Sequence, residues 1–147
     1  MARYAGVLAF HGRRVVLVRE EYPTWGGEFW NLPSGRVEDG ESPAEGAARE
    51  LAEETGLVVA PADLLLVSTT VTAHGDRESR AWNHVVEVAA TELCVADPDG
   101  IVREARWFDV ADAVEVLAIL PYRPLAEPAV AYLTGRAEPG REWHFVL

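Results

Sequence analysis

The fold of this chain is decided by the stretch GRVEDGESPAEGAARELAEETGL, residues 35–57. The centre of this stretch carries the start and stop signals of a helix. Residues 42–45 (SPAE) form a capping-box pattern with proline at the first helical position, and Gly56 is a common residue just past a helix end. The pattern predicts a helix from about Pro43 to Glu54.

The predicted helix has two different faces. At 100° per residue, its small and apolar side chains gather on the side that should pack: Ala44, Ala47, Ala48, Leu51 and Ala52. The opposite side carries Glu50, Glu53 and Glu54 with Arg49 beside them, and Gly46, one turn earlier, should leave that side open. Neighbouring carboxylates repel one another by roughly 0.2–0.5 kcal/mol per pair. Mg²⁺ or Mn²⁺ would remove this repulsion, whereas an acidic run without a pattern is usually a solvated surface.

The same stretch resembles the signature of the Nudix hydrolases at every defined position. These positions are Gly35, Glu41 and seven positions within the run RELAEETGL at residues 49–57. Nine defined positions over 23 residues would arise by chance on the order of once in a billion windows. The approach WNLP at residues 30–33 also resembles the family, although Ser34 stands where many members have glycine.

The resemblance implies an α/β (α+β) fold in which a mixed β-sheet is sandwiched between α-helices, with residues 1–147 as a single domain. It also implies hydrolysis of a nucleoside diphosphate linked to another group, by attack of water on phosphorus with Mg²⁺ bound, for which Mn²⁺ can substitute. Phosphoryl transfer depends mainly on charge neutralisation and in-line positioning, and this fits an acidic helix face that binds divalent cations.

Roles for individual residues follow from the same resemblance. The implied metal ligands are the Gly35 carbonyl and the carboxylates of Glu50, Glu53 and Glu54. Glu53 or Glu50 is the expected base for the attacking water, and Arg49 would orient the carboxylates through ion pairs. Glu41 is expected to support the loop, or a metal ion through water.

Three further residues are predicted to belong to the site from outside this stretch. Glu104, three residues before Trp107, is the expected additional metal ligand, the alternative being an ion pair with a neighbouring arginine. Trp25, in a glycine-rich loop, is the best candidate for stacking on a nucleobase. Arg19 is a second expected substrate-binding residue.

The substrate is predicted by elimination. The proline that often marks ADP-ribose hydrolases would fall near Ala73 and is absent, as are the marks of dinucleoside-polyphosphate and NADH hydrolases. A nucleoside triphosphate, oxidised forms included, is therefore the leading expectation. The alternatives are a nucleotide-sugar or ADP-ribose pyrophosphatase, a non-catalytic nucleotide- or metabolite-sensing domain, and isoprenoid diphosphate isomerisation.

Composition excludes other classes of protein. The 147 residues carry a net charge of −11, and every basic residue is arginine. Without lysine there is no Schiff-base chemistry and no Walker-type phosphate loop. We expect a small-molecule nucleotide as partner, with no nucleic acid and no membrane, and a monomer or homodimer in the cytoplasm. The single cysteine, Cys94, fits that reducing setting and is expected in the core.

Hydrophobic patterning predicts strands on both sides of the helix. The expected strands are Tyr4–Phe10, Arg14–Arg19, Leu57–Ala60, Leu64–Val71, Ala81–Leu93 and Glu104–Phe108. The segments Glu20–Glu28 and Thr72–Arg80 are expected to be loops, and residues 97–100 a turn. Two further helices are predicted, one from Asp109 to about Leu117 and one from Pro124 to near Gly135.

Overall fold

Eight strands form one mixed sheet in the computed structural model, which describes residues 1–147. The strands are β1 (Ala2–His11), β2 (Arg14–Tyr22), β3 (Gly27–Asn31), β4 (Ser34–Arg36), β5 (Leu65–His74), β6 (Arg77–Glu87), β7 (Val102–Asp109) and β8 (Arg141–Val146). Their order is β3-β2-β1-β6-β5-β8, with β4 beside β1 and β7 beside β2. The β1–β6 and β5–β8 pairs are parallel and the other pairs antiparallel.

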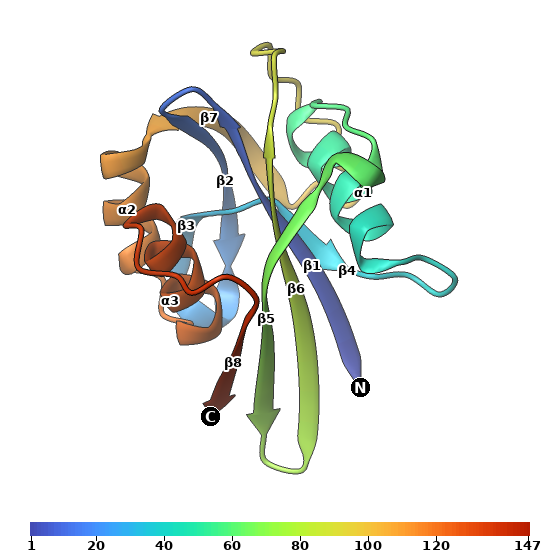
Figure 1. Cartoon of the computed structure of the whole chain (residues 1–147), viewed down its shortest axis with the longest axis vertical. Coiled ribbons are helices and arrows are strands. Elements are labelled where there is room, and N and C mark those ends of the chain that lie inside the picture. The colour runs from blue at the N-terminus through green and yellow to red at the C-terminus, as the bar shows by residue number, and fades with distance from the viewer.

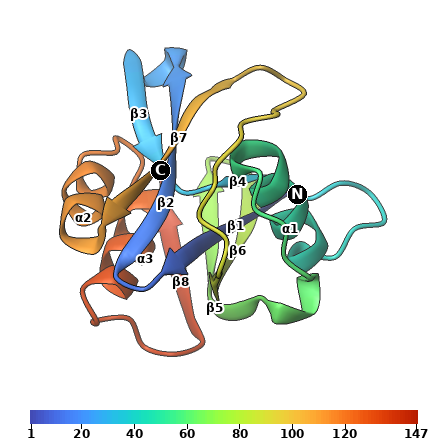
Figure 2. The same cartoon turned by 90° about the horizontal axis from the view of Figure 1, so that it is seen from above.

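Three α-helices cover the two faces of this sheet: α1 (Pro43–Thr55), α2 (Val110–Ala118) and α3 (Arg123–Leu133). Figures 1 and 2 show α1 on one side of the strands and α2 with α3 on the other. Two clusters of buried side chains fill the spaces between sheet and helices. Leu17 and Leu117 belong to the cluster under α2 and α3, and Val16 and Leu51 to the cluster under α1. The expected mixed sheet between helices is confirmed.

Helix α1 begins and ends as the sequence predicts. Ser42 Oγ accepts a hydrogen bond from the Glu45 backbone N–H, and the Glu45 carboxylate accepts one from the Ser42 N–H. Gly56 adopts the left-handed conformation with φ of 80°, and its N–H bonds to the Ala52 carbonyl at 2.9 Å. A Cβ at Gly56 would lie 2.8 Å from the Cys94 carbonyl oxygen. Glycine is therefore required here for both conformation and space.

A split in the sheet brings β4 to its centre. β1 pairs with β2 only around Phe10 and His11, and at its other end it pairs with β4 instead. The Val7 N–H donates to the Pro33 carbonyl at 3.0 Å, which joins the segment before β4 to the middle of β1. As a result Gly35 lies beside α1, against the acidic side of the helix.

Several sequence-based expectations are wrong in detail. Residues 20–28 are not one loop, because β2 continues to Tyr22, a 3₁₀ turn covers Pro23–Trp25 and β3 begins at Gly27. Pairing of β2 with β3 and contacts among the aromatic side chains stabilise this hairpin. Similarly, most of the expected loop 72–80 is paired strand, with its turn at Gly75 and Asp76.

Three further differences lie elsewhere in the chain. No strand forms at residues 57–60, and β8 was not predicted. Cys94 is exposed and not in the core, since its segment contacts the end of α1 through backbone hydrogen bonds such as Cys94 N–H to the Thr55 carbonyl. The α-helices are all too short to cross a membrane.

Candidate active site

The acidic side of α1 holds a carboxylate that is almost completely buried. Glu54 is 6% exposed, and one of its oxygens accepts a hydrogen bond from the Ser34 N–H at 3.2 Å. Burial, together with the neighbouring carboxylates of Glu50 and Glu20, raises the pKa of Glu54 well above its ordinary value. Burial and the Glu50 charge also raise the pKa of Glu53. These carboxylates are close enough for each to oppose ionisation of the next.

Gly35 lies against this cluster with no room for a side chain. A Cβ built at Gly35 would overlap the carboxylate of Glu50. The chain thus brings a partly exposed peptide backbone and a carboxylate into direct contact, and a side chain at position 35 would displace the Glu50 carboxylate. The predicted neighbours Gly35 and Glu50 are therefore brought together.

Arg49 connects the helix to the loop before it. Its Nε and Nη2 reach the two oxygens of Glu41 at 2.7 and 3.0 Å, a bidentate pair that lowers the pKa of Glu41. Its Nη1 lies 2.9 Å from Glu50 and 3.4 Å from Glu53, and Nη2 also donates to the Arg36 carbonyl at 2.9 Å. Arg49 therefore holds three glutamates and the end of β4 in one arrangement.

The expectation that Gly46 leaves the acidic side open is wrong. Gly46 is buried, and a Cβ there would lie 3.1 Å from a Glu41 oxygen and 3.5 Å from Val37. The small residue admits the loop that Glu41 and Val37 belong to. Position 46 serves packing of this loop against α1.

Glu20 is a member of the carboxylate cluster that sequence reasoning missed. Its carboxylate accepts a hydrogen bond from the Tyr22 hydroxyl, and burial raises its pKa, with Asp97 and Glu50 adding to the effect. On β2, Val16 and Val18 are alternate residues, and Val16 packs under α1. Continuing this alternation by one step would have placed Glu20 on the α1 face. The assignment of Glu20–Glu28 to a loop hid this signal.

Glu104 and Arg19 lie on the other face of the same strands. They are directly opposite in the β2–β7 register, and Arg19 Nε is 3.3 Å from a Glu104 oxygen. Arg19 also pairs with Glu28, and Glu104 with Arg106 at 3.5 Å. Neither residue lines the cavity described next. The roles of Glu104 as a metal ligand and of Arg19 as a substrate-binding residue stay predictions. In this structure Glu104 forms ion pairs with arginines, as its alternative interpretation predicts.

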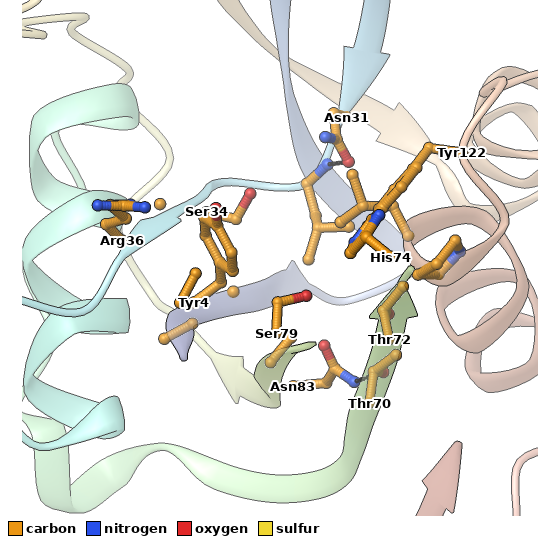
Figure 3. A pocket seen from close by; sticks show the side chains of 18 of the residues that line it. Tyr4, Asn31, Ser34, Arg36, Thr70, Thr72, His74, Ser79, Asn83 and Tyr122 are labelled. Carbon is orange, nitrogen blue, oxygen red and sulfur yellow. Dashed lines mark hydrogen bonds between the residues drawn. The ribbon is translucent and has the colours of Figure 1, made fainter. Parts of the chain in front are cut away.

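A cavity of about 1020 Å³ lies across the sheet, and Glu20 is the one carboxylate of the cluster that lines it, whereas Glu50, Glu53 and Glu54 do not. Glu20 and Gly35 line one part of it, and Tyr22, Trp25 and Tyr122 line another. The Trp25 ring stacks on Tyr22 with centroids 4.1 Å apart and on Tyr122 at 5.9 Å. Figure 3 shows the polar side chains of β5 and β6 forming the floor, with Tyr4 on one side and Tyr122 and His74 on the other. Trp25 is thus part of the cavity wall, as its predicted role requires.

The donor set fits a hard divalent cation. Every candidate ligand is an oxygen. Burial first, and neighbouring carboxylates second, raise the pKa values of Glu20, Glu53 and Glu54, and a divalent cation would favour the ionised form of each. As the side chains lie, no three His, Cys, Asp or Glu residues form a ready-made cage for an ion. Binding therefore requires rotation of the glutamate side chains about a backbone already in position.

Comparison with known proteins agrees with this arrangement. A model of the NUDIX domain matches residues 2–133. The chain is 33% identical over 117 residues to diphosphoinositol polyphosphate phosphohydrolase 3-beta of Homo sapiens, covering 77% of this chain and 67% of that protein. It is 32% identical over 104 residues to an 8-oxo-dGDP phosphatase of Danio rerio, covering 71% of this chain and 31% of that protein.

The fold is also similar to that of a solved structure, a NUDIX hydrolase from Nitrosomonas europaea. The TM-score is 0.75 at 18% identity, over 99% of this chain and 78% of that one. The chain spans less than half the length of the first curated relatives that it matches. Since the family match covers nearly all of β1 to α3 together with the acidic helix and its glycine, the chain belongs to the NUDIX family.

Proposed function

We propose that the protein is a Mg²⁺-dependent pyrophosphohydrolase of nucleoside triphosphates, oxidised forms included, acting by attack of water on phosphorus. The observation that carries this proposal is a cavity lined by Glu20 and by Gly35, which lies against the Glu50 carboxylate, together with a wall of aromatic rings. Carboxylates beside a glycine backbone suit metal-bound phosphates, and aromatic walls suit a nucleobase. The 8-oxo-dGDP phosphatase among the relatives supports a nucleotide substrate.

Each residue of the cluster has a role in this proposal. The Gly35 carbonyl, Glu50, Glu53 and Glu54 would hold the cation or cations. A bound divalent cation supplies charge neutralisation on the phosphates and lowers the pKa of water. Glu53 is the first candidate to accept the proton of the attacking water, because it remains partly exposed and Arg49 orients its carboxylate. Glu50 is the second candidate for this base.

Arg49 and Glu41 act through the ligands. Arg49 bonds to Glu50 and Glu53 and is itself held by Glu41 and the Arg36 carbonyl. This pairing restricts the carboxylates to one side of the helix, so that the proton acceptor is oriented before the substrate arrives.

A diphosphoinositol polyphosphate is a less suitable substrate, although a relative carries that name. Among the ionisable residues lining the cavity, the arginines Arg36 and Arg77 stand against Glu20, Asp76 and Glu78. A ligand with phosphates around its whole ring needs a more cationic site than this.

The test is release of phosphate or pyrophosphate from a panel of nucleoside triphosphates, nucleotide sugars and ADP-ribose, with Mg²⁺ and with chelator. We expect Mg²⁺-dependent turnover of triphosphates that the Glu53→Gln variant loses. Glu115→Gln, an exposed carboxylate of α2, is the matched control and should retain full activity. Tight nucleotide binding with no turnover under any condition would instead identify a sensing domain.

A further inference from the structure

The floor of the cavity contains an amide whose orientation is held by its neighbours. Ser68 of β5 lies opposite Asn83 of β6 in the register, and Thr70 lies two residues further along β5. Asn83 Nδ2 donates to Ser68 Oγ at 2.9 Å and to Thr70 Oγ1 at 3.1 Å. Both hydrogens of the amide nitrogen are therefore bound within the sheet, and the amide plane is fixed.

The oxygen of the same amide is free. Asn83 Oδ1 takes part in no hydrogen bond, and no buried side-chain nitrogen or oxygen of the protein lacks a partner. Oδ1 is thus accessible to solvent, and Asn83 lines the cavity. Figure 3 shows its nitrogen turned toward Thr70 and its oxygen turned away from it. The floor presents a hydrogen-bond acceptor at a defined position.

The other amide of the cavity has no such free atom. Asn31 Oδ1 accepts from the Leu32 N–H at 2.8 Å, and its Nδ2 donates to the Tyr22 hydroxyl at 3.0 Å. Asn31 is also 2% exposed, so it supports the wall and cannot readily bond to a ligand. Asn83 is the asparagine that is available for recognition.

The walls on either side of this acceptor suit a flat ring. Tyr122 and His74 stand on one side with their rings nearly parallel, at 5°, and Tyr4 stands on the other. The Tyr122 hydroxyl and His74 Nε2 are 3.2 Å apart, which keeps the two rings together. A planar base that enters between these walls turns its edge, where its polar groups lie, toward the floor.

We propose that Asn83 selects the nucleobase by accepting a hydrogen bond from an exocyclic amino group, which favours adenine and cytosine over hypoxanthine and uracil. This inference rests on the proposed function for the identity of the ligand as a nucleotide. A base that carries a carbonyl oxygen in place of the amino group would set two acceptors against each other, and both would lose their bonds to water. Ser68 and Thr70 act as positioning residues.

The experiment measures equilibrium binding of nucleoside monophosphates by calorimetry in chelator, so that no hydrolysis is needed. Two pairs compare an exocyclic amino group with a carbonyl oxygen at the same ring position: AMP with IMP, and CMP with UMP. In each pair the adjacent ring nitrogen is unprotonated in the first member and protonated in the second. We expect the amino member of each pair to bind at least 10-fold more tightly to the unmodified protein. Asn83→Leu should reduce this ratio to within about two-fold, while Asn83→Asp, which retains an acceptor, should keep it.

Because the two affinities of each pair are measured on the same protein, their ratio does not depend on what fraction of that protein is folded. Thermal unfolding of each variant checks folding separately. If Asn83→Leu does not fold, Asn83→Val, which also lacks an acceptor, takes its place. Equal binding of both members, a preference for IMP and UMP, a ratio that survives Asn83→Leu, or no binding at millimolar nucleotide would each overturn the inference. A clear amino preference without turnover of any triphosphate would leave the inference standing and refute the proposed function. Turnover without the preference would do the reverse.

Discussion

Glu54 illustrates how much one residue can depend on its surroundings. It is more deeply buried than Glu53, one position earlier, and it contacts β4 by accepting a hydrogen bond from the Ser34 N–H. An isolated buried carboxylate is costly, and burial usually resolves by proton uptake, by pairing or by metal binding. Arg49 pairs with Glu50 and Glu53 but not with Glu54, so the proposed function assigns a cation to Glu54, and its raised pKa indicates proton uptake when no cation is bound.

Replacing these carboxylates tests their roles individually. Glu53→Gln and Glu54→Gln should each lower kcat by at least about 100-fold, because each removes charge stabilisation at the phosphate. The measurement is steady-state turnover at saturating Mg²⁺, with circular dichroism to confirm folding. Near-normal activity of either variant would refute the ligand assignment.

Glu20 and Glu104 offer a direct comparison between two carboxylates outside the acidic helix. Glu104→Gln is expected to lower kcat and move the Mg²⁺ dependence of the rate to higher concentration if Glu104 completes the metal site. If Glu20→Gln shows this shift and both quantities for Glu104→Gln stay within two-fold of the unmodified protein, then Glu20 belongs to the metal site and Glu104 does not, in agreement with their contacts in this structure. A two-fold effect corresponds to about 0.4 kcal/mol.

Among the elements, α1 was the most predictable. Its cap, its apolar side and its terminal glycine are all local signals, and they recur in the structure with one residue of difference at the end. The end of the β2–β3 hairpin was not predictable in this way, because residues 20–28 combine charged side chains with proline and glycine and are held by pairing and aromatic contacts across the turn. β8 was missed because it pairs with β5, some 70 residues distant in sequence. Glu20 was absent from the expected site because its segment was assigned to a loop, and Asn83 because only the pairing of β5 with β6 brings it to Ser68 and Thr70.

The end of α1 can be tested by comparing two glycines with positive φ. Gly56→Ala should lower the free energy of unfolding by about 2–4 kcal/mol. The new Cβ would clash with the Cys94 carbonyl oxygen, and alanine would also bear the cost of the left-handed conformation. Gly75→Ala, where a Cβ meets nothing within 4 Å, should cost only about 1–2 kcal/mol. Urea denaturation measures both, and equal losses would show that the contact at position 56 is unimportant.

For the molecule as a whole, the sequence predicted a sheet between helices, but it did not predict which parts of the sheet support the fold and which part brings Gly35 to the acidic helix. The two clusters under the helices form the support, and the split of β1 between β2 and β4 admits the glycine backbone to the acidic helix. Such a split depends on the pairing of three strands, so the hydrophobic pattern of any one strand does not indicate it. The acidic charge, by contrast, was visible in composition, and it leads to a prediction about stability.

Divalent cations should stabilise the whole fold. Glu20, Glu53 and Glu54 have folded-state pKa values raised above those of the unfolded chain, so their contribution to stability is present at low pH and is lost as pH rises through the folded values. Millimolar Mg²⁺ should therefore raise Tm, and more at pH 8 than at pH 6, where protons compete with the ion.

The measurement is thermal unfolding at both pH values with Mg²⁺ or chelator. Glu54→Gln should lose most of the Mg²⁺ response, and Glu115→Gln should retain it. A Tm that ignores Mg²⁺, Mn²⁺ and chelator alike would argue against a cation site on α1.

The position of Trp25 in the cavity wall, where its ring stacks on Tyr22 and Tyr122, also allows ligand binding to be followed by tryptophan fluorescence. Of the five tryptophans, Trp25 is the one that lines the cavity, so its indole emission is the component that an entering base would quench or shift. Subtracting the spectrum of a Trp25→Phe variant should isolate this component. Nucleotide titrations could then be followed in real time with no label, and an emission spectrum that a saturating nucleotide leaves unchanged would show that the base lies elsewhere.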